Sequence, residues 1–160
     1  MSKEDTKDLL KCLAPFSAEI TDLVMWLRSF VWDKYPNANE LIYDNYNAVA
    51  FGWSLTEKLG QTFCTIAVGR TSLNIHFGFY FGSVLSDPNH ILLGDGNQYR
   101  YILVKNKSSF PKTYISKLLK EAVVNATEKL KGKKPALQGQ TILKSISPKK
   151  REKKGKSSKS

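Results

Sequence analysis

The sequence lacks long apolar runs and is poor in cysteine and histidine, with two of each among its 160 residues. No run approaches the roughly 18 apolar residues that span a membrane, so the composition excludes a transmembrane protein. Cys12 and Cys64 are too few for a disulfide scaffold, and neither has the CxxC or Cys/His spacing of a zinc site. The polar residues 1–5 are unlike the start of a secretory signal. We therefore expect a cytoplasmic protein with no membrane association, no metal centre and no cofactor.

The first 130 residues also lack an excess of either charge, although the whole chain carries a formal net charge of +11. They contain 14 Lys or Arg and 13 Asp or Glu, which leaves +1. Residues 131–160 contain 11 Lys or Arg and a single acid, Glu152, which leaves +10. Attraction to nucleic acid or to another polyanion is therefore expected of the last thirty residues and not of the rest of the chain.

The two ends of the chain carry the periodicity of helices. Apolar residues recur at helical spacing over residues 18–34, and Ser17 precedes them as an N-cap. A shorter segment, residues 4–13, favours a first helix that Pro15 ends. Residues 110–130 repeat the pattern and predict a C-terminal helix.

The middle of the chain changes to the two-residue period of strands. Residues 73–79 alternate large apolar side chains with polar or small ones, as in an antiparallel strand with one buried face. A short apolar run at 41–43 precedes a turn at 44–47. Residues 82–96 have the composition of a loop. The other expected strands are 48–53, 62–68 and 99–105.

These elements predict an α+β fold, with a central antiparallel sheet and the N-terminal and C-terminal helices on one of its faces. The expected organisation is a domain at residues 1–130, then a linker and candidate docking segment at 131–148. The last part, residues 149–160, is rich in lysine and serine and is expected to be disordered.

A polar and aromatic group in the first turn is the first candidate ligand site. Asp44 is a hydrogen-bond acceptor for a ligand amine or hydroxyl, and Tyr43 and Tyr46 are candidate walls. The alternative is a hairpin turn in which the acid binds its own backbone. Tyr80 and Phe81 fall outside the strand alternation and are further candidates for lining a pocket.

A second candidate group consists of Asp87, Asp95 and Arg100. The planar guanidinium of Arg100 suits a carboxylate or phosphate ligand. The alternative is an internal ion pair of Arg100 with Asp44 or Asp87. An enzyme would place its site near Asp44 and Arg100, so the convergence of Tyr43, Asp44 and Arg100 on one concavity is the decisive observation.

The basic C-terminal segment is a candidate nucleic-acid contact through phosphate neutralisation, without any means of reading sequence. The alternative is a segment that only increases solubility. The candidate contacts are Lys149, Lys150, Arg151, Lys153 and Lys154.

Four sequence strings together resemble the YdhG-like domain-of-unknown-function family, over roughly residues 18–148. They are ELIYDNYNA at 40–48, GSVLSDP at 82–88, LLGDGN at 92–97 and YRY at 99–101. The resemblance implies a small cytoplasmic bacterial α+β domain, close in shape to frataxin-like iron chaperones, with no catalytic set of residues. The acids of residues 4–22 are interleaved with lysines, so we expect little or no iron binding.

The resulting functional expectation is a non-enzymatic domain that binds a small ligand, a metal or a protein. One alternative is a nucleic-acid-associated protein that binds phosphates through its basic tail. The other is an enzyme of undetermined reaction with a site near Asp44 and Arg100.

Overall fold

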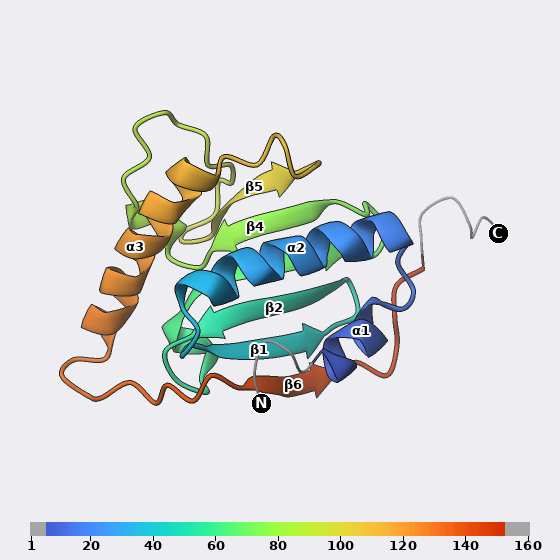
Figure 1. The fold of residues 1–160 in the computed structure, drawn as a ribbon, viewed down its shortest axis with the longest axis horizontal. Coiled ribbons are helices and arrows are strands. Elements are labelled where there is room, and N and C mark those ends of the chain that lie inside the picture. The colour runs from blue at the N-terminus through green and yellow to red at the C-terminus, as the bar shows by residue number, and fades with distance from the viewer. Residues whose placement is uncertain (1–5, 153–160) are drawn as a thin grey trace.

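The computed structural model describes residues 6–152 as a sheet with helices on one face, which confirms the α+β class (Figure 1). The described residues form six strands and three α-helices. The helices are α1 (Lys7–Leu13), α2 (Ala18–Lys34) and α3 (Lys112–Lys129). The strands are β1 (Asn39–Asp44), β2 (Ala48–Ser54), β3 (Thr62–Gly69), β4 (Ile75–Phe79), β5 (Arg100–Val104) and β6 (Thr141–Ile146). Two short 3-10 turns are η1 (Leu59–Gln61) and η2 (Gly82–Val84).

Helix α2 has the predicted bounds and the predicted cap. The Ser17 side chain accepts a hydrogen bond from the Ile20 N–H at 3.2 Å, which satisfies one of the free donors of the first turn. Its side chains Leu27 and Val31 are fully buried against the sheet. The described part of α1 begins at Lys7, and residues 4 and 5 of the expected first helix, 4–13, lie outside the described residues.

Strands β1 to β5 follow one another as an antiparallel meander, and each pairs with the next. Strand β4 begins at Ile75 and not at the expected residue 73, because Leu73 has a φ of 60° in the turn before it. The spatial order is β5-β4-β3-β2-β1-β6, so β1 and β5 are four positions apart.

The sixth strand makes the sheet mixed, which corrects the expectation of a purely antiparallel one. Strand β6 pairs parallel with β1, and Leu143 lies beside Ile42. It comes from the segment expected to be a linker and docking segment. Its chain direction follows from α3, which carries the chain back to the end of the sheet where β1 begins (Figure 1).

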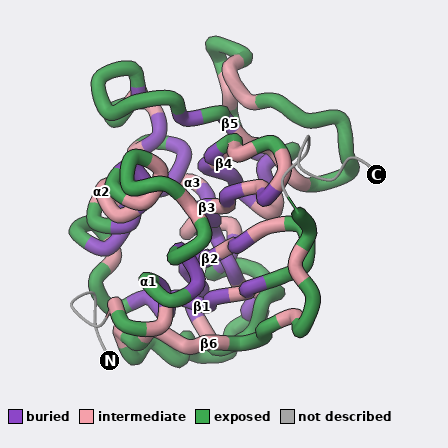
Figure 2. The backbone as a smooth tube through the Cα atoms, turned by 90° about the vertical axis from the view of Figure 1, so that its right-hand side faces the viewer, coloured by how far each residue is buried: buried purple, intermediate pink, exposed green. Residues whose placement is uncertain are grey.

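The helices lie on one face of the sheet (Figure 2). Cross-strand register aligns Ile42, Phe51 and Ile66 under α2, and all three are fully buried. Helix α3 begins on the same side, since the Lys112 ammonium lies 5.9 Å from the Trp26 ring centre on α2. We call the other side, where no helix of residues 6–152 lies, the open face. None of these helices is long and apolar enough to cross a membrane.

Candidate functional site

Asp44 and Arg100 do not converge. Asp44 ends β1 and Arg100 begins β5, and four strand spacings correspond to about 19 Å. The register also places them at opposite ends of the sheet: Asp44 is level with Val104, whereas Arg100 pairs with Phe79. The expected joint site of Tyr43, Asp44 and Arg100 is therefore absent from the described structure.

Asp44 is a buried structural acid and not an open acceptor. Its carboxylate pairs with an Nη atom of Arg70, whose Nε donates to the Asn45 carbonyl at 3.0 Å. The Lys150 ammonium lies 3.3 Å from the other carboxylate oxygen. Asp44 ends β1, Arg70 follows β3 and Lys150 follows β6. These three strands run in the same direction, so their C-terminal ends lie at the same end of the sheet and the three side chains meet there. This shared strand direction is the signal that could have identified Arg70 as the partner.

Asp87 and Arg100 hold their own loop and neither pairs with the other. The Asp87 carboxylate accepts hydrogen bonds from the N–H groups of Ile91 and Leu92, at 3.1 and 2.9 Å, and from the Tyr114 hydroxyl of α3. Partial burial alone would raise the pKa of Asp87, but these hydrogen bonds lower it below its ordinary value. Arg100 Nη1 donates to the carbonyls of Gly96 and Tyr99 at 2.7 and 2.8 Å.

The tail residues divide between structural contacts and a region outside the described residues. Besides its ion pair, the Lys150 ammonium donates to the carbonyls of Asp44 and Ser147. The Arg151 guanidinium donates to the side chain of Asn47 at 3.3 Å. The Lys150 ammonium therefore binds groups of the protein itself, and its assignment as a phosphate contact stays a prediction. Lys149 is described and exposed, whereas Lys153 and Lys154 lie outside the described residues.

Aromatic side chains gather on the open face, among them Tyr43. Adjacent positions across the sheet are Tyr43, Ala50, Ala67 and His76, so β2 and β3 contribute only small side chains to this row. The neighbouring row is formed by Leu41, Gly52, Thr65, Gly78 and Tyr101. Tyr46, by contrast, lies in the β1–β2 turn and is 47% exposed.

We call Tyr43, His76, Tyr80, Tyr99 and Tyr101 the tyrosine cluster. The rings of His76 and Tyr101 are parallel, with centres 4.1 Å apart, and Tyr99 stacks on Tyr101 at 5.7 Å. Tyr80 lies 6.0 Å from Tyr99, with its hydroxyl beside Thr65. All five residues are half-buried, so parts of their rings remain exposed on this face.

A glycine allows the cluster to lie flat on the sheet. A Cβ atom at Gly78 would lie 2.2 Å from the Tyr99 hydroxyl oxygen, so any larger residue there would displace the ring. Burial raises the pKa of Tyr43, Tyr80 and Tyr99 and lowers that of His76, which favours the uncharged form of each side chain.

Two members of the tyrosine cluster, Tyr43 and Tyr80, are among the residues that the sequence predicts for a ligand site. His76, Tyr99 and Tyr101 are not among them. The available signal is the alternation of tyrosines at 99 and 101, together with the small residues that alternate at 48, 50 and 52. Phe81 is elsewhere, under the Lys129 ammonium at 4.1 Å.

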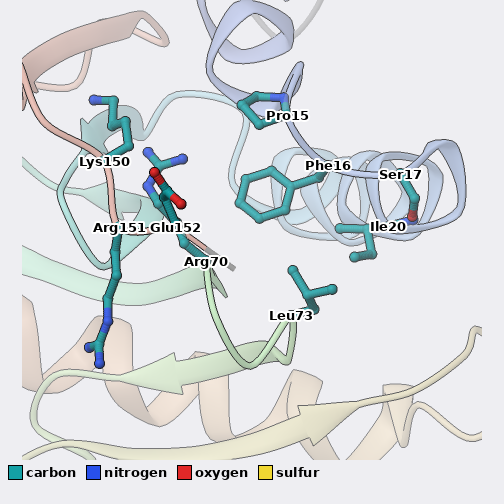
Figure 3. A pocket seen from close by; sticks show the side chains of 9 residues that line it. All are labelled: Pro15, Phe16, Ser17, Ile20, Arg70, Leu73, Lys150, Arg151 and Glu152. Carbon is teal, nitrogen blue, oxygen red and sulfur yellow. The ribbon is translucent and has the colours of Figure 1, made fainter. Parts of the chain in front are cut away.

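A pocket lies at the end of the sheet where strand β1 finishes with Asp44, and we call it the end pocket (Figure 3). Its volume is about 750 Å³. One side is apolar and the other charged, and the C-terminal segment forms part of the charged side. The lining residues are Pro15, Phe16, Ser17, Ile20, Arg70, Leu73, Lys150, Arg151 and Glu152.

The two thiols are held in their protonated form. Burial and the neighbouring Asp44 carboxylate raise the pKa of Cys12 to about 11. Complete burial raises the pKa of Cys64 well above its ordinary value. Neither thiol is therefore an activated nucleophile at neutral pH. Within residues 6–152, no three His, Cys, Asp or Glu side chains gather as a metal site would require.

The tyrosine cluster and the end pocket both combine side chains from segments far apart in the sequence, so neither is visible as a single local motif. No family model, no curated protein and no solved structure matches this chain.

Proposed function

We propose that this protein is a non-enzymatic binding protein for single-stranded nucleic acid, with the open face as its binding surface. The observation that carries the proposal is the stacked, uncharged tyrosine cluster on a sheet face that no described helix covers. Unpaired bases stack on aromatic side chains of this kind, and each such contact contributes about 1–3 kcal/mol.

The shape of the open face favours an extended ligand. Tyr43 lies on β1 and Tyr101 on β5, so the cluster spans about 19 Å across the sheet. Between them, Ala50 and Ala67 leave room above the strands. A chain of bases can contact both ends of such a surface, which one small planar ligand cannot.

The charge distribution supports a polyanionic partner. Residues 131–160 carry a net charge of +10. Strand β6 brings this segment along the β1 edge, and its exposed Lys144 lies at the irregularity of pairing beside Tyr43. Phosphate neutralisation by these cations would supply salt-dependent affinity, while stacking would confer the preference for single strands.

The resemblance to the YdhG-like family remains part of this proposal. The segments that carry it supply three members of the cluster, Tyr43 from residues 40–48 and Tyr99 with Tyr101 from residues 99–101. The resemblance is thus compatible with a binding role for the open face, and it supplies no catalytic residues.

The test is fluorescence anisotropy with fluorescein-labelled oligothymidine at two salt concentrations. Tyr101→Ala should weaken binding about 5- to 150-fold, as expected for one lost stacking contact, with an unchanged salt slope. The matched control is Leu103→Ala, on the same face of the same strand and 39% exposed, which should bind like the wild type.

A second variant distinguishes the contribution of the basic C-terminal residues to binding from that of the open face. Deletion of residues 153–160 removes four lysines and spares Lys150. The salt slope should become shallower by up to about 3, at roughly 0.7 per phosphate contact on a single strand. Equal affinity of Tyr101→Ala and wild type would reject the open face as the binding surface. No binding by the wild type at low salt would reject the function.

A further inference from the structure

The end pocket combines an apolar wall with a charged one. Figure 3 shows Phe16, Ile20 and Leu73 on one side and the charged side chains across from them. Its volume of about 750 Å³ is in the range of small-molecule sites. Such a pocket suits a ligand with one charged group and an apolar body.

Arg70 is held in place for an anion. It is only 6% exposed, and two of its three guanidinium nitrogens are hydrogen-bonded, Nε to the Asn45 carbonyl and one Nη to Asp44. The other, Nη1, has no hydrogen-bond partner among the described residues, and it is not a buried unpaired atom. It is therefore open to solvent in the pocket and is fixed before any ligand arrives. The guanidinium lies 5.9 Å from the Phe16 ring centre, where the charged and apolar walls meet.

The charges around the pocket leave room for one negative charge. Arg70, Lys150 and Arg151 line the pocket, and the nearby carboxylates are Asp44, which pairs with Arg70 and Lys150, and the lining residue Glu152. One positive charge therefore remains uncompensated. A monoanion would neutralise it, whereas a dianion would exceed it.

Leu73 adds an independent observation. Its φ of 60° is a left-handed conformation that is strained for a branched side chain and that glycine adopts freely. Strained residues of this kind cluster at ligand sites. The Leu73 side chain lines the apolar wall of the pocket. Glycine at position 73 would be less strained, and a contact between the leucine side chain and a ligand would account for the presence of leucine there.

We infer that the end pocket binds a small monocarboxylic acid with an apolar body. The carboxylate accepts a hydrogen bond from Arg70 Nη1, and the hydrocarbon part packs on Phe16 and Leu73. This site is separate from the open face, and its occupancy does not depend on nucleic-acid binding.

The test is an NMR titration of the ¹⁵N-labelled full chain with 3-phenylpropanoate and with the uncharged 3-phenylpropan-1-ol. The acid should bind at least about tenfold more tightly than the alcohol, as expected for a charge-assisted hydrogen bond. Amide shifts should concentrate at Phe16, Arg70 and Leu73. Equal affinities for acid and alcohol, or shifts confined to other parts of the chain, would overturn the inference.

Two variants test separately whether the charged wall and the apolar wall of the end pocket contact the ligand. Arg70→Gln should weaken the acid at least about tenfold and leave the alcohol unchanged, and Lys150 still pairs with Asp44 in this variant. Leu73→Gly should weaken both compounds, and its unfolding midpoint should show that the fold is intact, since glycine relieves the φ strain. Leu103→Ala, on the open face, is the control and should bind both like the wild type. If both pocket variants bind the acid like the wild type, the site assignment is wrong.

Discussion

On the helix-covered face of the sheet, the register aligns Ile42, Phe51 and Ile66 in one row, whereas the adjacent row on the open face contains Tyr43, Ala50 and Ala67. The first row is fully buried and the second is half-buried. The same strands thus contribute large apolar side chains to one side and small ones to the other. Stability should therefore depend mainly on the covered face and on the residues that tie β1 to its neighbours, and binding should depend on the open face.

The largest loss of stability is expected on removing β6. Deletion of residues 137–160 removes the Gln138 N–H that donates to Asn39 and the Thr141 hydroxyl that donates to Glu40. Both β1 residues are fully buried. Unsatisfied buried groups cost about 1–3 kcal/mol each, so with the lost strand we expect about 4–6 kcal/mol in urea unfolding. Deletion of 153–160 is the control and should stay within about 0.5 kcal/mol. Equal midpoints would show that β6 contributes no stability.

The second largest loss is expected at the buried ion pair under α2. Arg28 donates through Nε and Nη2 to the two carboxylate oxygens of Glu40, both at 2.9 Å, and both side chains are almost completely buried. Glu40→Ala leaves the guanidinium without this carboxylate, so the free energy of unfolding should fall by about 3–5 kcal/mol. Tyr43→Phe, on the open face of the same strand, should change it by less than about 0.5 kcal/mol. A loss below 1 kcal/mol for Glu40→Ala would contradict the ranking of the two faces.

A smaller loss is expected where the tyrosine cluster contacts the sheet. Gly78→Ala places a methyl group against the Tyr99 ring, which must move, so we expect a loss of about 1–3 kcal/mol and weaker oligothymidine binding. Gly96→Ala is the control, because a Cβ there meets nothing within 4 Å. If Gly78→Ala leaves both stability and binding intact, the ring does not lie on the sheet as described.

The smallest effect concerns pH. Burial lowers the pKa of His76 in the folded state, so the unfolded chain binds more protons as the pH falls below the ordinary value of 6.5. The free energy of unfolding should therefore decrease from pH 7 towards pH 5. His76→Gln should remove this component from chemical unfolding curves measured across that range. An identical pH dependence in the variant would assign the effect to other groups.

Local patterns predicted the helices closely. Helix α2 has the expected bounds and Ser17 caps it, since both depend on residues within one turn of one another. Helix α3 falls within the expected 110–130. The strands β2 and β3 each end one residue beyond the expected range. The predicted start of β4, residue 73, is wrong by two residues, because alternation does not reveal that Leu73 takes a left-handed φ.

Pairings between distant residues could not be predicted in the same way. The expected partners of Arg100 were Asp44 and Asp87, yet it binds backbone carbonyls of its own loop. Asp44 binds Arg70, 26 residues away, and Lys150, 106 residues away. Charge alone does not distinguish between these candidates, since the pairing depends on which strands finish at the same end of the sheet.

The sequence by itself determined the α+β class, the positions of the helices and the concentration of positive charge after residue 130, because periodicity and composition are local properties. Only the tertiary structure decided that β6 joins the sheet parallel to β1, that the tyrosine cluster assembles on the open face, and that Arg70 faces the end pocket. Each of these depends on strand order and register, which bring together residues from opposite ends of the chain. Those contacts form only when the whole sheet folds, so no segment read alone contains them.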